Sequence, residues 1–182
     1  MDYIFAYYCA PALAGIKSAN IVSCDKLKIR DAEEKIARLN LQLNKKDIFF
    51  EILWRCSKSI LVMVYRKRVL EKTLGEEKIY RFLRTFGYPE RVTSEGYIEF
   101  LKSRMKNQEF PHEIGAFLGY PLHDIQGFLY HKDFGCLLCG EWKVYKDAER
   151  AEKLFDRFAA CRRAVTDRVM RGYTLAQIFC AV

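Results

Sequence analysis

Three stretches of the chain hold side chains that could do chemistry. A cysteine lies in YCAPALAGIKSAN at 8–20, a histidine lies in FPHEIGAFLGYPLHDIQGF at 110–128, and GEWKVYKD spans 140–147. A thiolate is a competent nucleophile when a helix N-terminus, a lysine or a protonated imidazole lowers its pKa. Cys9 and His112 are therefore predicted to act as nucleophile and general acid/base, provided that the fold brings them together.

The residues next to this pair fit the same prediction. Proline is favoured in the first turn of a helix, so we expect a short helix to begin at Pro11, with Cys9 near its N-terminal end. Glu113 or Asn20 would then orient the imidazole of His112. The competing interpretation is structural, because free cysteine is among the most buried residue types and a glutamate in a first helical turn suits the helix dipole.

A second cysteine motif, CLLC at 136–139, raises the question of metal binding. Cys136 and Cys139 could offer two thiolates to zinc or to an iron–sulfur cluster. The sequence has no second pair at a zinc spacing, and the motif lies in a segment with the alternation of a strand. These two cysteines are therefore weak metal candidates, and the sequence requires no cofactor.

The segment 111–131 also has the spacing of a helix-turn-helix. Pro111 and Pro121 each stand where a short helix would begin, and Gly119 lies at the turn between them. The outward positions of the second helix would carry one carboxylate and no lysine or arginine, so the usual groups for reading bases and neutralising phosphates are missing. We therefore expect a packed helix pair, and nucleic acid is not the expected partner.

Composition and charge limit the kinds of protein that this chain could be. The chain has 182 residues, 51% of them hydrophobic and 30% charged, which favours one compact domain over 1–182. The net charge is +8, but acids interleave with the basic residues between Lys146 and Arg171, which is typical of a solvated helix face. The 7 cysteines form no dense disulfide framework, and the sequence has no secretory or membrane-spanning segment. We therefore expect a reduced, cytoplasmic protein that does not associate with membranes.

The periodicities predict an α+β fold. Two apolar runs rich in β-branched residues predict a hairpin at 48–65, and its second run is apolar enough for a central strand buried on both faces. Alternation predicts a further strand at 138–145, and helical spacing predicts about six or seven helices. These include the short pair at 111–131 and a long C-terminal helix. The predicted sheet is small, mostly antiparallel and built from about three or four strands.

The three motifs together resemble the bacterial domain-of-unknown-function family 3793 (DUF3793). The resemblance covers essentially the whole chain, and it implies no established activity. It also directs attention to the polar residues of the motifs, because backbone geometry explains only the glycines and prolines. The residues that we assign on this basis to ligand binding are Lys17, Asn20, Trp142, Lys143 and Tyr145.

Two functional classes remain open from the sequence. The first is a thiol-dependent enzyme or a small-ligand-binding protein, with a site built from the CAPALAGIK, FPHEIG and WKVY motifs and a small molecule as partner. Catalysis would use Cys9, His112 and Glu113. The alternative is a helix-turn-helix-like module that associates with nucleic acid or with another protein and has no catalytic activity. Only the enzyme needs a solvent-reachable Cys9 thiol beside the His112 ring.

Overall fold

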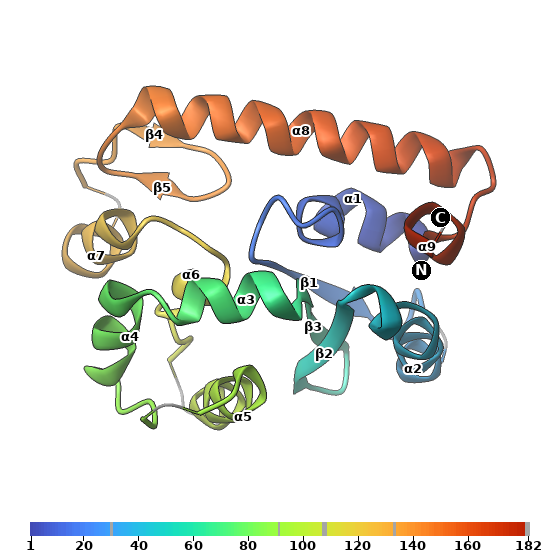
Figure 1. The fold of residues 1–182 in the computed structure, drawn as a ribbon, viewed down its shortest axis with the longest axis horizontal. Coiled ribbons are helices and arrows are strands. Elements are labelled where there is room, and N and C mark those ends of the chain that lie inside the picture. The colour runs from blue at the N-terminus through green and yellow to red at the C-terminus, as the bar shows by residue number, and fades with distance from the viewer. Residues whose placement is uncertain (30, 91, 107–108, 133, 181–182) are drawn as a thin grey trace.

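The structure is a computed structural model that describes residues 1–29, 31–90, 92–106, 109–132 and 134–180 (Figure 1). Within these ranges the chain forms nine α-helices, one 3-10 helix and five strands, so the α+β class is confirmed, with more helices than the six or seven predicted. In chain order the elements are α1 (Asp2–Leu13), β1 (Ala19–Asp25), α2 (Ala32–Leu43), η1 (Asn44–Lys46), β2 (Ile48–Arg55), β3 (Ser59–Arg66), α3 (Lys67–Leu74), α4 (Glu77–Arg84), α5 (Ser94–Arg104), α6 (Ile114–Phe117), α7 (Leu122–His131), β4 (Leu138–Cys139), β5 (Lys143–Val144), α8 (Ala148–Met170) and α9 (Leu175–Cys180).

The main sheet has three antiparallel strands in the order β1-β3-β2. Because successive side chains of a strand point to opposite faces, β3 contributes Val62 to the core on one side and Met63 to the core on the other. Both side chains are 0% exposed. The hairpin predicted at 48–65 and the burial of its second strand on both faces are therefore confirmed.

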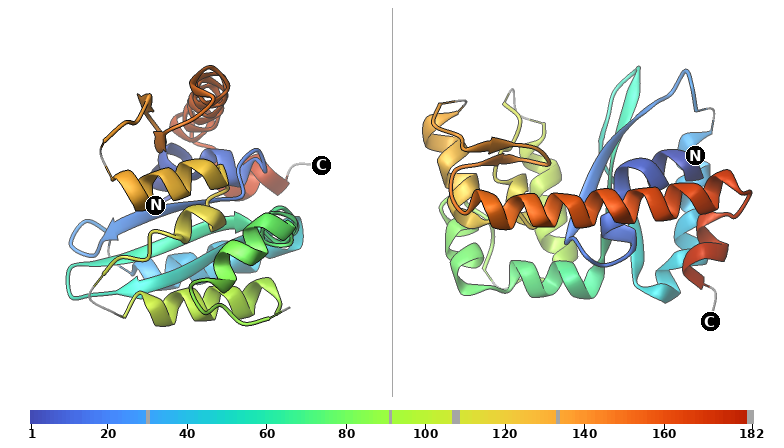
Figure 2. Two further views of the ribbon diagram at one scale, coloured as in Figure 1. Left: turned by 90° about the vertical axis from the view of Figure 1, so that its left-hand side faces the viewer. Right: turned by 90° about the horizontal axis from the view of Figure 1, so that it is seen from above.

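Helices cover both faces of this sheet (Figure 2). The core on one face joins α1 and α2 with the end of α8 and with α9, and it includes Phe5 and Leu43. The core on the other face joins α3 to α7, and it includes Leu83 and Phe117. Helices such as α2 and α4 bury an apolar stripe in these two cores, as their periodicity predicts.

The long helix α8 ties the N-terminal part of the chain to the β4–β5 hairpin. It packs along α1 and extends from the hairpin to α9 (Figures 1 and 2). Its first half makes a small third core, in which Ala151 and Phe158 pack with Trp142 and Val144 of the hairpin region. In the described ranges, no helix combines the length and the apolar character that a bilayer span requires.

The N-terminal region departs from its predicted course. α1 begins at Asp2 and contains Pro11 within its last turn, whereas a helix was expected to begin at Pro11. The apolar residues before the proline explain the earlier start, because Phe5 and Cys9 pack against the sheet and are 0% exposed. The segment that follows, ANIVSCD at 19–25, is an edge strand that the sequence analysis did not predict.

The strand predicted at 138–145 is also different in the structure. Two strands of two residues each, β4 and β5, form a separate hairpin in which Leu138 pairs with Val144. Trp142 lies in the turn segment between them and is buried against α8. The helix pair at 111–131 is present as α6 and α7, although α6 has a single turn.

Candidate functional site

The Cys9 thiol lies inside the protein and not at a reactive surface. Cys9 is 0% exposed, near the C-terminal end of α1, so it has neither solvent contact nor the helix N-terminus that was expected to activate it. Burial, assisted by Cys24, raises the pKa of the Cys9 thiol far above its ordinary value, and the opposing effect of Lys17 is smaller. The prediction of a solvent-reachable Cys9 nucleophile is therefore wrong, since desolvation disfavours the thiolate.

His112 has a different set of neighbours. Its exposed ring lies edge-on to the rings of Phe110 and Phe128, with centroid distances of 5.9 and 5.0 Å. Partial burial is the main cause that lowers the pKa of the imidazole, and the positive charge of the nearby Lys132 lowers it further. None of these neighbours belongs to α1, so no contact in the described part of the chain joins this ring to the Cys9 thiol.

Glu113 is a structural ion-pair partner rather than an orienting group for His112. Its side chain is buried, accepts a hydrogen bond from the Tyr88 hydroxyl at 3.4 Å, and forms a short ion pair with Arg104. A buried carboxylate is tolerated when it is paired in this way. The assignment of Glu113 to a catalytic group with His112 is not supported by these contacts.

Asn20 and Tyr145 also make contacts within the fold. The Asn20 side-chain oxygen accepts a hydrogen bond from the Ala12 amide at 3.1 Å and thereby joins β1 to the end of α1. The Tyr145 hydroxyl donates to the carbonyl of Lys132, and its ring lies against Gly127, where any added Cβ would come within 2.5 Å of the ring. Both side chains hold elements together, and neither lines any of the three cavities described below.

Cys136 and Cys139 lie in the region of the small hairpin. Cys139 is exposed in β4 and Cys136 is half-buried just before it. Among residues 1–29, 31–90, 92–106, 109–132 and 134–180, no group of three or more His, Cys, Asp or Glu side chains could hold a metal ion. The described geometry therefore offers these cysteines no further ligands.

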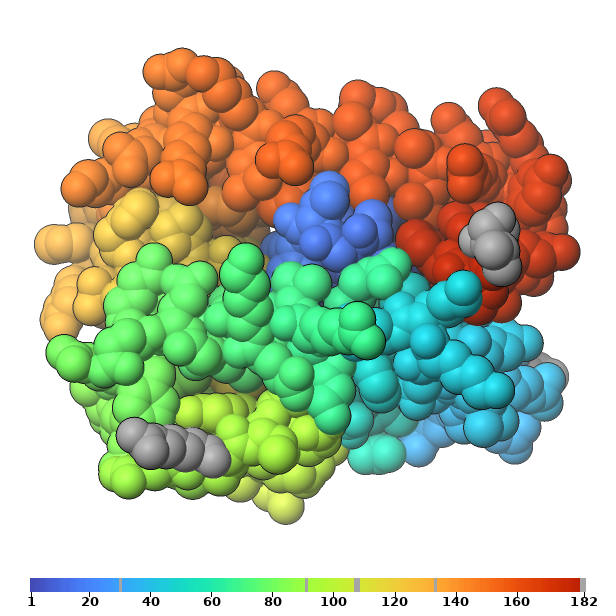
Figure 3. Space-filling view, in the orientation of Figure 1, coloured from blue at the N-terminus to red at the C-terminus, as the bar shows by residue number. Residues whose placement is uncertain are grey.

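A cleft of about 750 Å³, which we call the interhelical cleft, is lined by residues from all three motif segments. It lies between the loop after α1, helix α3, the α6–α7 turn and the start of α8. In Figure 3 the surface is hollowed where the blue loop, the green α3, the yellow α7 and the orange α8 meet. Its polar lining comes from all three motif regions and includes Lys17, Ser18, Tyr120, Lys146 and Arg150.

Lys17 is a buried cation in the wall of this cleft. Its ammonium nitrogen lies 3.7 Å from Glu141 and over the rings of Tyr120 and Phe158, at 5.1 and 5.6 Å from their centroids. Burial lowers the pKa of Lys17 to about 8, while Glu141, which also pairs with Arg162, limits the decrease. Lys17 is therefore mostly charged at neutral pH yet poorly solvated, a state that favours an additional anionic partner.

Ser18, the next residue, has an unsatisfied hydroxyl group. It is 5% exposed, lines the cleft, and its Oγ has no hydrogen-bond partner in the described structure. A buried hydroxyl without a partner costs free energy, so native proteins usually supply one from the chain, from water or from a ligand. Ser18 is thus a lining residue of the cleft whose hydroxyl has no partner, next in sequence to the buried Lys17.

The chain holds these two residues in place through backbone geometry. Gly15 has a φ of +75°, which closes α1, and the amides of Ile16 and Lys17 both donate to the carbonyl of Pro11. On the opposite side Gly119 has a φ of +74°, and a Cβ there would come within 3.0 Å of the Ser18 Cβ. The GIKS and LGYP segments therefore meet at a point where neither tolerates a larger residue at its glycine.

The rim of the cleft adds positive charge. Lys146 and Arg150 line the cleft at the start of α8, and neither side chain has an ion-pair partner among the described residues. Asp147, at the N-cap of α8, makes no side-chain capping hydrogen bond, so the first amides of a 23-residue helix are left for other partners. The surroundings of Lys17 and Ser18 are thus suited to negative charge.

Asp124 fastens the hairpin to α7. Its buried carboxylate accepts hydrogen bonds from the Trp142 ring nitrogen at 2.8 Å and from the backbone amides of Tyr145 at 2.7 Å and Lys146 at 3.3 Å. These donors occupy both carboxylate oxygens. Although Asp124 lines the cleft, its charge is engaged in holding the third motif against the second.

A second cavity lies beside the first, and three of the predicted site residues line it. We call this cavity of about 260 Å³ the aromatic pocket. His112, Trp142 and Lys143 share it, so the structure brings together the second and third motifs, as expected for a composite site. Its remaining lining is mainly apolar, from β1, α6 and α7.

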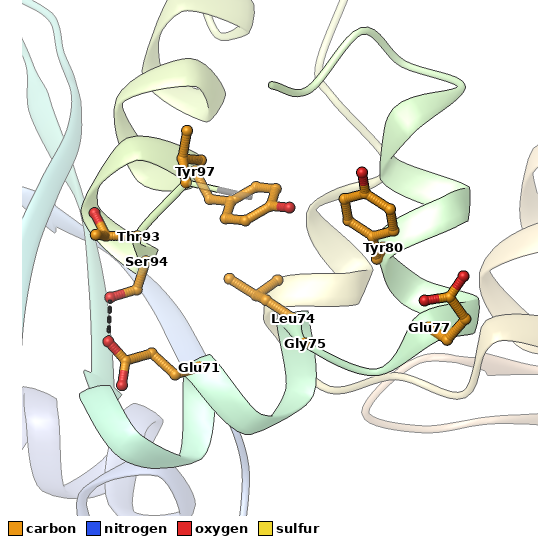
Figure 4. Close-up of a pocket in the computed structure, with 9 residues that line it drawn as sticks. Glu71, Leu74, Gly75, Glu77, Tyr80, Thr93, Ser94 and Tyr97 are labelled. Atoms are coloured by element: carbon orange, nitrogen blue, oxygen red, sulfur yellow. Dashed lines mark hydrogen bonds between the residues drawn. The ribbon is translucent and has the colours of Figure 1, made fainter. Parts of the chain in front are cut away.

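A third cavity, of about 470 Å³, is less suited to be the site (Figure 4). Tyr97 extends from α5 toward the side where Tyr80 stands on α4, and Ser94 donates to Glu71 at 3.2 Å. None of its lining residues comes from the three motifs. The interhelical cleft and the aromatic pocket therefore remain the candidate sites.

Sequence reasoning missed several of the polar residues at the cleft. Ser18, Asp124 and Arg150 all line the cleft, and none of them is among the predicted site residues. One signal was available, because Ser18 and Asp124 both lie inside the motif segments. Their roles depend on long-range contacts that no local pattern shows.

Comparisons with known proteins give a family but no function. No curated protein and no solved structure matched the chain. A family model described as "Protein of unknown function (DUF3793)" matches residues 5–179, nearly the whole sequence. The match agrees with the resemblance carried by the three motifs around the cleft and the pocket. The chain therefore belongs to the DUF3793 family of proteins of unknown function.

Proposed function

We propose that this protein binds a small anionic molecule, through its phosphate or carboxylate groups, in the interhelical cleft. The observation that carries the proposal is the pair Lys17 and Ser18. One is a buried cation and the other a buried hydroxyl without a partner, and both line the same cavity. An anion bound in the cleft would give the ammonium group a further partner and the hydroxyl group an acceptor.

The charges around the cleft support this choice of ligand. Four lysine and arginine side chains and three carboxylates line it. Two of the carboxylates are already engaged, because Glu76 pairs with Lys78 at 3.1 Å and Asp124 accepts three hydrogen bonds from the hairpin. Lys17, Lys146 and Arg150 therefore provide the charge that an anion would meet, with the start of α8 at the rim.

Binding without thiol chemistry is the better-supported form of the small-molecule hypothesis. The buried Cys9 lacks the exposure that nucleophilic attack needs, and no cysteine of the described ranges lines the cleft. All seven cysteines have free thiols, which fits the reducing, cytoplasmic setting that we include in the proposal.

The nucleic-acid alternative has less support in the contacts of α7. Trp142 and Tyr145 of the hairpin region lie against this helix and bond to its Asp124. They cover part of the surface that a recognition helix would need to present to a groove. We keep this alternative as an outcome of the test.

The test is calorimetric titration of the purified protein with sulfate, phosphate and citrate at constant ionic strength. Ser18→Ala removes the unpaired hydroxyl, and Ser23→Ala is the matched control, because Ser23 is exposed on the same strand-forming segment and lies outside the cleft. We expect at least one anion to bind and Ser18→Ala to weaken it roughly tenfold, as for loss of one hydrogen bond to a charged group. Ser23→Ala should bind like the unchanged protein.

A second pair of variants tests the positive charge at the rim of the cleft. Arg150→Gln should weaken anion binding roughly three- to tenfold, whereas Arg157→Gln, an exposed position on the same helix outside the cleft, should not. Equal affinities for all four variants would contradict the proposal. A salt-sensitive shift with duplex DNA that persists in Ser18→Ala would instead favour the nucleic-acid alternative.

A further inference from the structure

We infer that the aromatic pocket is a second, separate binding site, which takes a small aromatic molecule carrying one hydroxyl or amine group. The pocket is lined by His112, Phe128, Trp142 and Lys143, with an apolar floor from β1, α6 and α7. This inference does not depend on the anion site, because a different set of observations supports it.

The size of the pocket sets the size of the ligand. Its volume is about 260 Å³. An apolar cavity of about 150 Å³ accepts benzene, so this pocket has room for a single substituted ring or a small fused ring system. It is too small for the side of a helix or for a nucleotide with its phosphates. The volume of the pocket therefore limits the ligand to a small molecule.

The lining favours a ring over an aliphatic chain. Trp142 lies edge-on to Phe155 and tilted against Tyr120, with centroids 4.6 and 4.8 Å away, so its position is fixed by packing. The Phe128 ring also lines the pocket, in contact with the His112 ring. Fixed ring edges and faces allow a bound aromatic molecule to adopt the offset or edge-to-face contacts that aromatic pairs prefer.

The floor of the pocket is apolar and well defined. Ile21 of β1, Ile114 of α6 and Ile125 of α7 meet there. Gly115 keeps the space between α6 and α7 narrow, because a Cβ at this position would come within 3.1 Å of both Ile125 and Tyr120. Apolar residues of β1, near the N-terminus, and of the consecutive helices α6 and α7 thus line one cavity.

His112 supplies the polar group that orients the ligand. Its ring nitrogens have no hydrogen-bond partner among the residues that the structure describes, although Phe110 and Phe128 flank the ring. A neutral imidazole offers one donor and one acceptor. A hydroxyl or amine on the ligand can pair with either nitrogen, so the site should distinguish a phenol from the same ring without its hydroxyl.

Methyl NMR on the unaltered protein locates the site without relying on a variant. The probe is para-cresol, a single ring with one hydroxyl. We expect the δ1-methyl signals of Ile21, Ile114 and Ile125 to shift in a saturable way, while that of Ile36, in the core on the other face of the sheet, stays unchanged. Absence of saturable shifts, or shifts centred on Ile36, would overturn the inference.

A pair of ligands and a pair of variants test the role of His112. Toluene has the shape of para-cresol without the hydroxyl, and His112→Phe keeps a ring between Phe110 and Phe128 but removes both nitrogens. We expect His112→Phe to weaken para-cresol about tenfold and to leave toluene unchanged. His131→Phe, outside the pocket, is the matched control and should change neither. If the unaltered protein binds the two ligands equally, His112 does not orient the ligand and the assigned class is wrong.

Discussion

The interhelical cleft and the aromatic pocket share two residues, Tyr120 and Asp124, yet they have opposite character. α7 turns Leu122 and Gln126 toward the cleft and Ile125 and Phe128 toward the pocket. The cleft has buried and rim cations, whereas the pocket is closed by rings and isoleucines. The two sides of one short helix, α7, therefore face two different chemical environments.

The proposed ligands differ for this reason. In the cleft, desolvated polar groups would provide affinity for charge. In the pocket, removal of apolar surface from water would provide affinity, and the His112 imidazole would orient the ligand. The shared Asp124 holds both together, because it fixes the hairpin that contributes to each.

The largest expected effect comes from breaking this shared element. Asp124→Ala would leave the Trp142 ring nitrogen and the amides of Tyr145 and Lys146 without their acceptor. We expect the free energy of unfolding to fall by about 3–5 kcal/mol, as when one partner of a buried charged network is removed. Urea denaturation followed by circular dichroism measures this, and both ligands should bind more weakly to the folded variant.

The control for this change is Asp156→Ala, an exposed aspartate on α8. It should alter stability by no more than about 0.5 kcal/mol. If the two variants lose similar stability, the hydrogen bonds of Asp124 do not hold the hairpin in the way described.

The variant Lys17→Met should affect ligand binding in the cleft and not in the pocket. It removes the buried ammonium group, while Glu141 keeps its pairing with Arg162. We expect sulfate binding in the cleft to weaken by about a hundredfold, with toluene binding in the pocket unchanged. Because a cation that titrates below its usual range is destabilising in the folded state, the variant should also be about 1–3 kcal/mol more stable near pH 7. Calorimetry with each ligand and urea denaturation measure these quantities, and a simultaneous loss of both ligands would show that Lys17 acts on the fold instead.

The pH dependence should differ between the sites. Burial lowers the pKa of Lys17 to about 8; the negative charge of Glu141 opposes this decrease, and the positive charge of Arg162 adds to it. Lys17 therefore loses its charge as the pH rises through 8. Sulfate keeps its charge over this range, so its affinity should fall about tenfold between pH 7 and pH 9. Toluene affinity should stay constant there. Partial burial and the nearby Lys132 lower the pKa of His112, against the smaller effects of Glu113 and Glu109, so the imidazole does not change its charge as the pH rises above 7. Titrations at half-unit intervals measure both curves, and a flat sulfate curve would remove Lys17 from the anion site.

The smallest effect is expected at Cys9. Its thiol is 0% exposed, and burial raises its pKa, whereas Cys56 is exposed and its pKa is lowered by hydrogen bonds from Ser59 and the neighbouring backbone. Iodoacetamide labelling followed by mass spectrometry should therefore modify Cys56 early and Cys9 last. Cys9→Ala should leave both ligand affinities unchanged. Rapid labelling of Cys9 in the native protein would restore the thiol hypothesis.

Much of the fold could be predicted from local patterns. The hairpin at 48–65 has runs of β-branched residues, and the long C-terminal helix has a continuous helical stripe. β1 could not be recognised in the same way, because ANIVSCD is a short edge strand whose identity depends on pairing with β3. The start of α1 was mistaken because Pro11, a common helix-starting residue, lies instead within the last turn of a helix that packs on the sheet.

The candidate site was predictable only in part. The motifs contain His112, Trp142 and Lys143, which line one cavity, and Lys17, which lines another, but their assignment to ligand binding stays a prediction. They did not show that Glu113 turns to Arg104 or that Asn20 binds the end of α1. Side-chain direction at such positions depends on partners that are many residues away, and no short-range spacing encodes it.

The sequence by itself determined the class of fold, its periodic elements and the three motifs through which the chain belongs to its family, because these depend on short-range patterns of apolar residues, glycines and prolines. Only the tertiary structure decided which polar groups are buried, paired or unsatisfied. It placed Cys9 in the core, and it left Ser18 beside Lys17 at the wall of a cleft. Reactivity and affinity depend on desolvation and on long-range partners, and these exist only once the sheet, α8 and the hairpin have packed together.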